Sequence, residues 1–142
     1  MPVVEIGKSR HVISFDVEDE VLKPFSLGYV REAFVKLDSI LDKVLEYRIR
    51  KKFPSEDSQR LVELMALSRA NASFTFIAYK SDIISTSQKD RIDRFKSIRN
   101  ILTHNSIGEL ELMVNKKQED VPKFLKSELE KGVSLAKELA GG

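Results

Sequence analysis

The amino-acid sequence predicts one mainly α-helical domain with four helices and a small accessory of two β-strands. The chain has 142 residues, which is within the usual size of a single domain and is enough to bury a core. Its 42% hydrophobic and 32% charged residues are typical of a globular protein. Over most of the chain, apolar residues recur at steps of three and four, which is the period of an amphipathic helix.

The N-terminal part combines a strand with a long helix. In residues 11–18, HVISFDVE, apolar and polar side chains alternate, which predicts a strand. From Leu27 to about Lys52 the spacing becomes helical, and the apolar stripe is wide enough to predict burial on two sides. That stripe contains Val30, Phe34, Leu37, Leu41 and Val44.

Two further helices follow. Pro54 ends the first helix, and Ser55 caps a second one that runs through Leu67. Residues 70–79 either continue this helix or form another structure, because their β-branched and aromatic content leaves both open. Ser87 and Asp90 resemble a capping box, which predicts the start of a third helix.

The C-terminal part contains the second strand and the last helix. The third helix is expected to end at Asn105, Ser106 and Gly108. Residues 109–114 then alternate between apolar and polar, which predicts a short strand that could pair with the N-terminal one. Asp120 and Pro122 are typical of a helix start and open the last helix.

The composition limits the kinds of function. The chain has no cysteine and two histidines, so neither a disulfide framework nor a structural zinc site is expected. A net charge of +2 is nearly balanced, so nucleic-acid binding would need a local basic patch. The first residues lack a signal-peptide pattern, and no apolar run is long enough for a membrane span. We therefore expect a cytoplasmic protein with no metal, no cofactor and no membrane partner.

The only concentrated chemistry in the sequence is the segment of residues 99–104, at the end of the third predicted helix. At 100° per residue, Asn100 and His104 fall on the outward face beside Lys96. Arg99 falls at the edge of the apolar stripe, where its long side chain can still reach outward. The stripe itself is predicted to contain Phe95, Ile98 and Leu102.

These side chains suit the cleavage of RNA without a metal ion. An imidazole titrates near neutral pH, so it can remove the proton of a ribose 2′-hydroxyl or protonate the leaving oxygen. A guanidinium offers a fixed fork of donors to phosphate oxygens and can stabilise the charge of a phosphorane-like transition state. The alternative is an ordinary helix end, because Arg and His also suit the helix dipole there.

Arg99, Asn100 and His104 resemble the defining motif of the HEPN superfamily, in which Arg and His are separated by four to six residues and Asn commonly follows the Arg. The resemblance implies a four- to five-helix bundle over residues 25–140, with residues 1–24 as an N-terminal extension. It also implies a homodimer or pseudo-dimer in which two motif copies face each other, and metal-independent endoribonuclease activity that leaves a 2′,3′-cyclic phosphate. Many members are toxins of toxin–antitoxin or phage-defence systems, which makes a cognate antitoxin a candidate partner.

The chain departs from one subgroup of that superfamily. Members that pair with a minimal nucleotidyltransferase often carry Tyr two residues after the His, and this chain has Ser106 there. The departure speaks against such a pairing.

Candidate RNA-binding residues lie outside the motif as well. Arg48, Arg50, Lys51 and Lys52 form a basic run, and together with Lys96 they are candidates for contacts to RNA phosphates. A solvated helix terminus is the alternative interpretation of the run.

Three functions therefore compete. The first is a metal-independent endoribonuclease that acts as a toxin or defence effector. The second is a non-catalytic HEPN-like module that binds a nucleotide, RNA or a protein. The third is an oligomeric interaction protein, which the two-sided apolar first helix favours.

Overall fold

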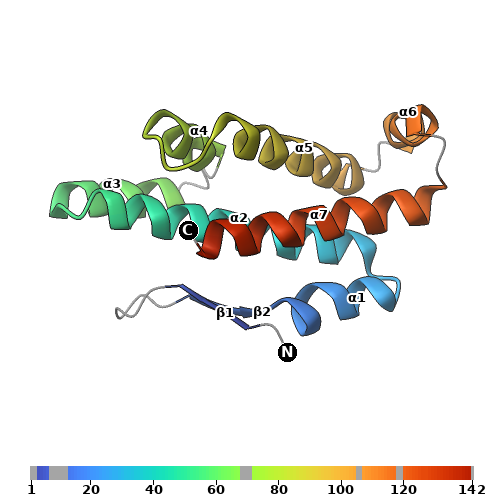
Figure 1. Ribbon diagram of the computed structural model, residues 1–142, viewed down its shortest axis with the longest axis horizontal. Helices are drawn as coiled ribbons and strands as arrows, with labels where there is room; N and C mark the ends of the chain where they lie inside the picture. The colour runs from blue at the N-terminus through green and yellow to red at the C-terminus, as the bar shows by residue number, and fades with distance from the viewer. Residues whose placement is uncertain (1–2, 7–12, 68–71, 105–106, 118–119, 142) are drawn as a thin grey trace.

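The computed structural model describes residues 3–6, 13–67, 72–104, 107–117 and 120–141 (Figure 1). Most of these residues are helical, so the mainly helical class predicted from the sequence is confirmed. In chain order the elements are β1 (Val3–Ile6), β2 (Ile13–Asp16), the π-helical turn η1 (Glu18–Leu22), α1 (Lys23–Ser26), α2 (Val30–Lys52), α3 (Glu56–Leu67), α4 (Ala72–Lys80), α5 (Thr86–Thr103), α6 (Ile107–Lys117) and α7 (Val121–Gly141).

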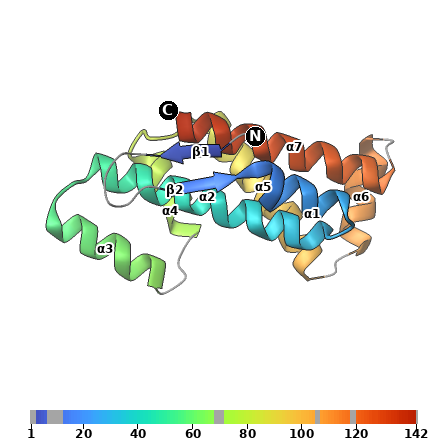
Figure 2. The ribbon, with the colours of Figure 1, turned by 90° about the horizontal axis from the view of Figure 1, so that it is seen from below.

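The long helix α2 is the centre of the fold. It packs against α4, α5 and α7 on one side and against β2, η1 and α1 on the other (Figures 1 and 2). The two-sided burial predicted for this helix is therefore confirmed. Helix α5 also packs directly on α7, and the two run in opposite directions, with α6 at the far end of α5.

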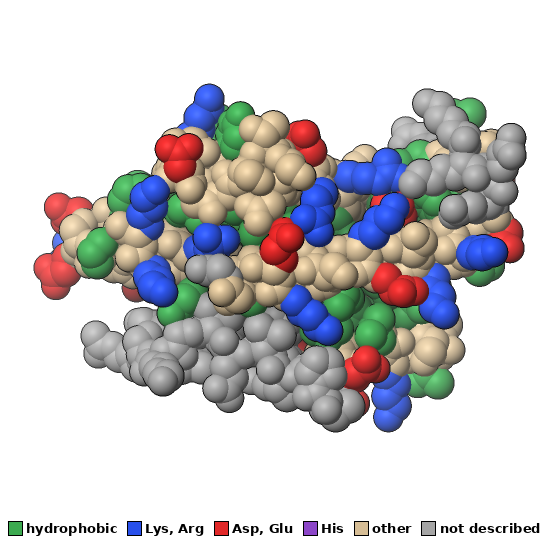
Figure 3. All heavy atoms as spheres, in the orientation of Figure 1, with side chains coloured by type: hydrophobic (Ala, Val, Ile, Leu, Met, Phe, Trp, Pro, Cys, Tyr) green, Lys and Arg blue, Asp and Glu red, His purple; other side chains and the backbone are tan. Residues whose placement is uncertain are grey.

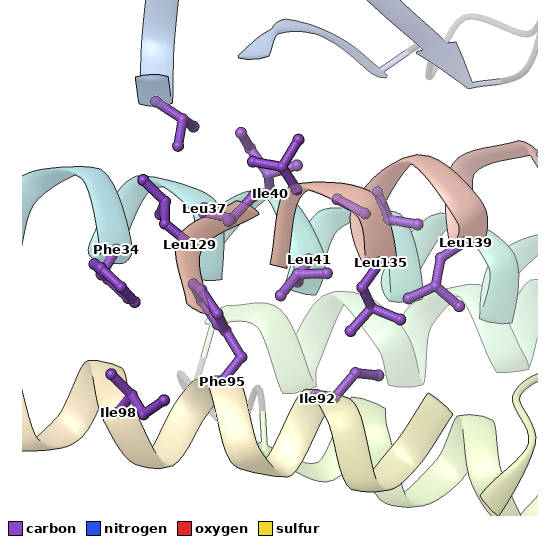
Figure 4. Packing of buried hydrophobic residues seen from close by; sticks show 14 of the residues in the cluster. Phe34, Leu37, Ile40, Leu41, Ile92, Phe95, Ile98, Leu129, Leu135 and Leu139 are labelled. Carbon is purple, nitrogen blue, oxygen red and sulfur yellow. The ribbon is translucent and has the colours of Figure 1, made fainter. Parts of the chain in front are cut away.

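The core holds α5 and α7 close to α2 (Figure 4). The rings of Phe34 on α2 and Phe95 on α5 stack with centroids 5.3 Å apart. Gly132 brings α7 against this pair, because a Cβ atom at that position would lie 2.7 Å from the Phe95 ring and 2.9 Å from the Leu37 side chain. The position therefore requires a residue without a side chain.

The N-terminal residues form a hairpin rather than a single strand. β1 and β2 pair antiparallel, with Val3 opposite Asp16 and Ile6 opposite Ile13. The carboxylate of Asp16 accepts a hydrogen bond from the backbone N–H of Glu18 at 3.0 Å, which caps the helical turn that follows. Residues 13–16 of the predicted strand 11–18 are thus extended, Val17 and Glu18 are helical instead, and residues 11–12 lie outside the described residues.

The prediction of a second strand at residues 109–114 is wrong, because these residues belong to helix α6. Leu110 and Val114 are buried and lie four residues apart, on one face of the helix, whereas Leu112 is 66% exposed. The predicted accessory, in which residues 11–18 pair with residues 109–114, is therefore not supported.

The start of α5 also differs from the expectation. Its N-cap is Ser85, whose hydroxyl accepts from the Gln88 N–H at 3.1 Å while the Gln88 side chain accepts from the Ser85 N–H at 2.9 Å. The predicted pair, Ser87 and Asp90, lies inside the helix and does not form the capping box. The start predicted for the last helix is confirmed, because the Asp120 carboxylate accepts from the Lys123 N–H at 2.8 Å.

Residues 72–80, which the sequence left open, form helix α4. None of the described helices combines the length and the apolar run that crossing a bilayer requires.

Candidate functional site

The C-terminal end of α5 presents Asn100 and His104 to solvent, as the sequence predicts. His104 is the C-cap residue, and its backbone N–H donates to the Asn100 carbonyl oxygen at 2.9 Å. Ile92, Phe95, Ile98 and Ile101 form the buried stripe of this helix, and Leu102 is only partly buried. The helical positions of Asn100 and His104 thus place both on the face opposite the core.

Arg99 lies at the edge of that face, with its side chain 30% exposed. Its Nε atom is 3.3 Å from Oδ2 of Asp38 on α2. Its Nη1 atom donates to Oδ1 of Asn100 at 2.9 Å. The guanidinium is therefore held between a buried carboxylate and an exposed amide. No hydrogen bond or ion pair links the His104 imidazole to Arg99 within the described part of the chain, and Ser106 lies outside it.

Lys96 does not lie on the outward face, contrary to the sequence-based prediction. Its Nζ atom is 2.6 Å from Oδ1 of Asp38 and 2.8 Å from Oδ1 of Asp42, and its side chain is 19% exposed. Asp38 and Asp42 are one helical turn apart on α2 and are both buried. We call Asp38, Asp42, Lys96 and Arg99 the α2–α5 cluster. Its lysine is engaged inside the protein, so Lys96 is not available to an RNA phosphate.

The protonation equilibria of this cluster follow from its burial and its two carboxylates. Burial raises the pKa of the Asp42 carboxyl, and the nearby Asp38 adds to this, although Lys96 and Arg99 oppose it. Burial acts to lower the pKa of Lys96, but the attraction of Asp42 and Asp38 outweighs it, so the pKa of Lys96 is raised. The lysine therefore stays charged between two carboxylates.

The basic run lies away from the Arg99–His104 segment. Arg50 pairs with Glu46 at 3.2 Å and donates to the Gln59 side chain at 2.9 Å. Lys52 donates to the carbonyl oxygen of Ser81, just before α5, while Arg48 is half-buried and Lys51 is exposed. The run is therefore near the first turn of α5, whereas His104 is at the other end, about 27 Å away along 18 helical residues.

The structure contains a basic groove that the sequence interpretation missed. It lies between α5 and α7 and has a volume of about 620 Å³. Lys and Arg side chains gather over the seam between these helices (Figure 3). We call this the α5–α7 groove; the cationic residues that line it are Arg91, Arg94, Lys123, Lys126 and Lys131.

A buried carboxylate organises the groove. Glu128 is 3% exposed, and its two oxygens lie 2.9 and 3.3 Å from Nε and Nη2 of Arg94. Lys131 also donates to Glu128, at 3.2 Å. Burial acts to raise the pKa of the Glu128 carboxyl, but hydrogen bonds from Arg94 and Lys131 outweigh it, so the pKa is lowered. The carboxylate therefore remains ionised and orients both cations.

Among the residues that the structure describes, no three His, Asp or Glu side chains are grouped as metal ligands would be. Comparisons with protein-family models, curated proteins and solved structures found no match to this chain.

Proposed function

We propose that this chain is a metal-independent RNA endonuclease of the HEPN type, with Arg99, Asn100 and His104 as its active-site residues. The observation that carries the proposal is the exposed end of α5. There the guanidinium of Arg99 forms an ion pair with Asp38 at 3.3 Å and donates to Asn100 at 2.9 Å, and the exposed imidazole of His104 follows Asn100 by one helical turn. A preoriented cation and a proton-transfer group at one helix end are the two groups that transesterification of RNA requires.

The reaction would proceed by attack of the ribose 2′-oxygen on the adjacent phosphorus. His104 accepts the 2′-hydroxyl proton, the phosphorus–5′-oxygen bond breaks, and the 5′-oxygen takes up a proton from an imidazolium or from water. Arg99 donates to the non-bridging oxygens while charge develops on them. The products are a 2′,3′-cyclic phosphate and a free 5′-hydroxyl, and no redox step or co-substrate is needed.

We also propose a homodimer in which two copies of this helix end meet. Asp93, Ser97, Asn100 and His104 form an exposed stripe along α5 that no described element covers. A two-fold axis beside this stripe would bring the same groups together from both copies, so that one imidazole can act as base and the other as acid. Light scattering should give about twice the chain mass of 16.2 kDa; a monomer at micromolar concentration contradicts the composite site.

The decisive experiment compares His104→Ala with Ser87→Ala, a substitution of an exposed serine at the other end of α5, outside the stripe. The substrate is an end-labelled single-stranded RNA in excess chelator, and the products are analysed for a cyclic phosphate end. Cleavage should fall by about 10²–10⁴ in the His104 variant and stay unchanged in the Ser87 variant. An RNA with 2′-deoxy substitutions should not be cut.

The competing function has its own outcome in the same experiment. If His104→Ala folds normally and cleaves as well as the natural chain, or if neither protein cleaves RNA, the nuclease proposal fails. The non-catalytic module that binds a nucleotide, RNA or a protein then takes its place. A toxin or defence role further predicts that expression of the natural chain, but not of His104→Ala, arrests growth unless a cognate antitoxin is present.

A further inference from the structure

We infer that the α5–α7 groove binds the phosphate backbone of single-stranded RNA, as a binding site separate from Arg99 and His104. The identity of the polymer rests on the proposed function, whereas the anion-binding character of the groove rests on its own residues. The basic run at residues 48–52, by contrast, lies at the opposite end of α5 and is tied to Glu46, Gln59 and Ser81.

The first argument is the local concentration of charge. Five cationic side chains and two acidic ones, Glu128 and Glu130, line the groove. The whole chain is nearly balanced, with 24 Lys and Arg against 22 Asp and Glu. The excess of positive charge is therefore concentrated in the groove, where the electrostatic potential would attract a polyanion.

The second argument is that the cations are oriented outward by a carboxylate behind them. Glu128 is 3% exposed, whereas the side chains of Arg94 and Lys131 that it holds are 41% and 57% exposed. Glu128 contacts Arg94 and Lys131 from the buried side, so the remaining N–H donors of these two cations face solvent. An oriented guanidinium fork is matched to phosphate oxygens.

Two further lysines of the groove form no ion pair with the part of the chain that the structure describes. Lys123 and Lys126 are exposed, and within the described residues their ammonium groups form no ion pair. They lie three residues apart on one face of α7. Unpaired cations beside an oriented arginine are available to neutralise phosphates and release counterions.

The third argument is direction. Gly132 of α7 lies against Phe95 of α5, and the helices run antiparallel, so earlier residues of α7 lie beside later residues of α5. Lys123 is therefore toward the end of α5 that carries His104. The groove spans about 12 Å between Lys131 and Lys123, at 1.5 Å per helical residue. A strand held there leads toward the proposed reacting groups.

The shape of the groove is compatible with a single strand. Neighbouring packed helices have axes about 8–10 Å apart. A furrow of about 620 Å³ between two such helices is wide enough for one phosphate backbone.

The test compares two double variants. One carries Lys123→Ala and Lys126→Ala in the groove, and the matched control carries Lys43→Ala and Lys137→Ala. The control lysines are exposed and lie outside the groove. The probe is a fluorescent 2′-O-methyl oligonucleotide, which has the charge of RNA but no 2′-hydroxyl to react. Fluorescence anisotropy at several salt concentrations gives the slope of log K against log salt.

We expect the groove variant to lower the magnitude of this slope by about 1.4, at about 0.7 for each lost phosphate contact on a single strand. The control should keep the slope of the natural chain. Equal losses in both variants, or none in either, overturn the inference. So does binding to phosphatidylserine vesicles with no binding to the oligonucleotide.

Because the probe cannot be cleaved, the two proposals fail separately. A normal groove result with no cleavage of natural RNA removes the nuclease but leaves the groove. Cleavage that depends on His104 while the oligonucleotide binds independently of Lys123 and Lys126 leaves the nuclease and removes the groove.

Discussion

The two sides of α5 use ion pairs in opposite ways. In the α2–α5 cluster, two carboxylates with side chains 12% and 10% exposed enclose Lys96, which is itself 19% exposed. In the α5–α7 groove, the carboxylate of Glu128 is buried and its cationic partners are turned outward. The first arrangement satisfies its cation internally, whereas the second leaves cationic groups facing solvent.

A basic residue is therefore not a ligand site by its type alone. Lys96 and Arg94 are two residues apart on one helix, yet Lys96 is enclosed by carboxylates from α2 and Arg94 faces the groove. Whether a basic side chain is available to a ligand depends on how many carboxylates oppose it and on whether the fold buries the cation or the carboxylate, because a buried charge needs a partner.

The largest effect should come from Lys96→Ala. Removing the lysine leaves Asp38 and Asp42 buried one turn apart, and loss of one partner from a buried ion pair costs about 3 kcal/mol. Chemical denaturation should show this loss in the free energy of unfolding. Lys43→Ala, on the exposed side of α2, should change it by less than about 0.5 kcal/mol.

A second substitution tests the cause of that loss. If the cost arises from two unpaired carboxylates, Asp42→Asn in the Lys96→Ala background should recover part of the stability. A Lys96→Ala protein as stable as the natural chain, or a double variant with no recovery, would show that the cluster is not an energetically coupled unit.

The next effect concerns the close approach of α7 to α5. Gly132→Ala would place a Cβ atom 2.7 Å from the Phe95 ring, which is itself stacked on Phe34 and is 3% exposed. Overpacking of this kind costs about 1–3 kcal/mol, which outweighs the gain in helix propensity of about 1 kcal/mol. We expect a lower melting temperature. The control, Gly108→Ala on α6, meets no atom within 4 Å and should be neutral or stabilising; a stabilised Gly132→Ala would contradict the packing.

The pH dependence of stability should have opposite signs on the two sides of α5. The pKa of Glu128 is lowered in the folded protein, so its contribution is present above the unfolded pKa and is lost as pH falls through the folded one. The pKa of Asp42 is raised, so the folded protein gains relative stability as pH falls. Between pH 7 and pH 4, the stability advantage of the natural chain over Glu128→Gln should shrink, whereas its stability relative to Asp42→Asn should improve. If both stability differences change in the same direction with pH, the contrast between the α2–α5 cluster and the α5–α7 groove is wrong.

The site features predicted correctly from the sequence are those that depend on a single helix. Asn100 and His104 are exposed as expected, because their positions on the long helix α5 follow directly from its periodicity. Lys96 was misplaced for the same reason, since helical position alone does not reveal a partner. Its carboxylates come from α2, 58 and 54 residues earlier in the chain.

Features formed by two helices together could not be predicted from the sequence. The α5–α7 groove joins Arg91 and Arg94 with lysines some 30 residues later, and neither group forms a continuous basic run. Helix α6 was misread because alternation over six residues is compatible with a helix when two of the apolar residues, Leu110 and Val114, lie four apart.

The smallest effect on stability should come from the third face of α5, the exposed stripe that takes part in neither ion-pair arrangement. His104→Ala removes an exposed side chain with no hydrogen bond to the described residues, so the free energy of unfolding should change by less than about 0.5 kcal/mol. For a chain of this size that is a shift in melting temperature of about 2 °C or less. Differential scanning calorimetry of this variant beside Ser97→Ala measures it, since both residues lie on the same stripe. A His104 variant that melts many degrees below the Ser97 variant would mean that the imidazole is needed for the stability of the fold or of the dimer, and the separation of function from stability on this face would be lost.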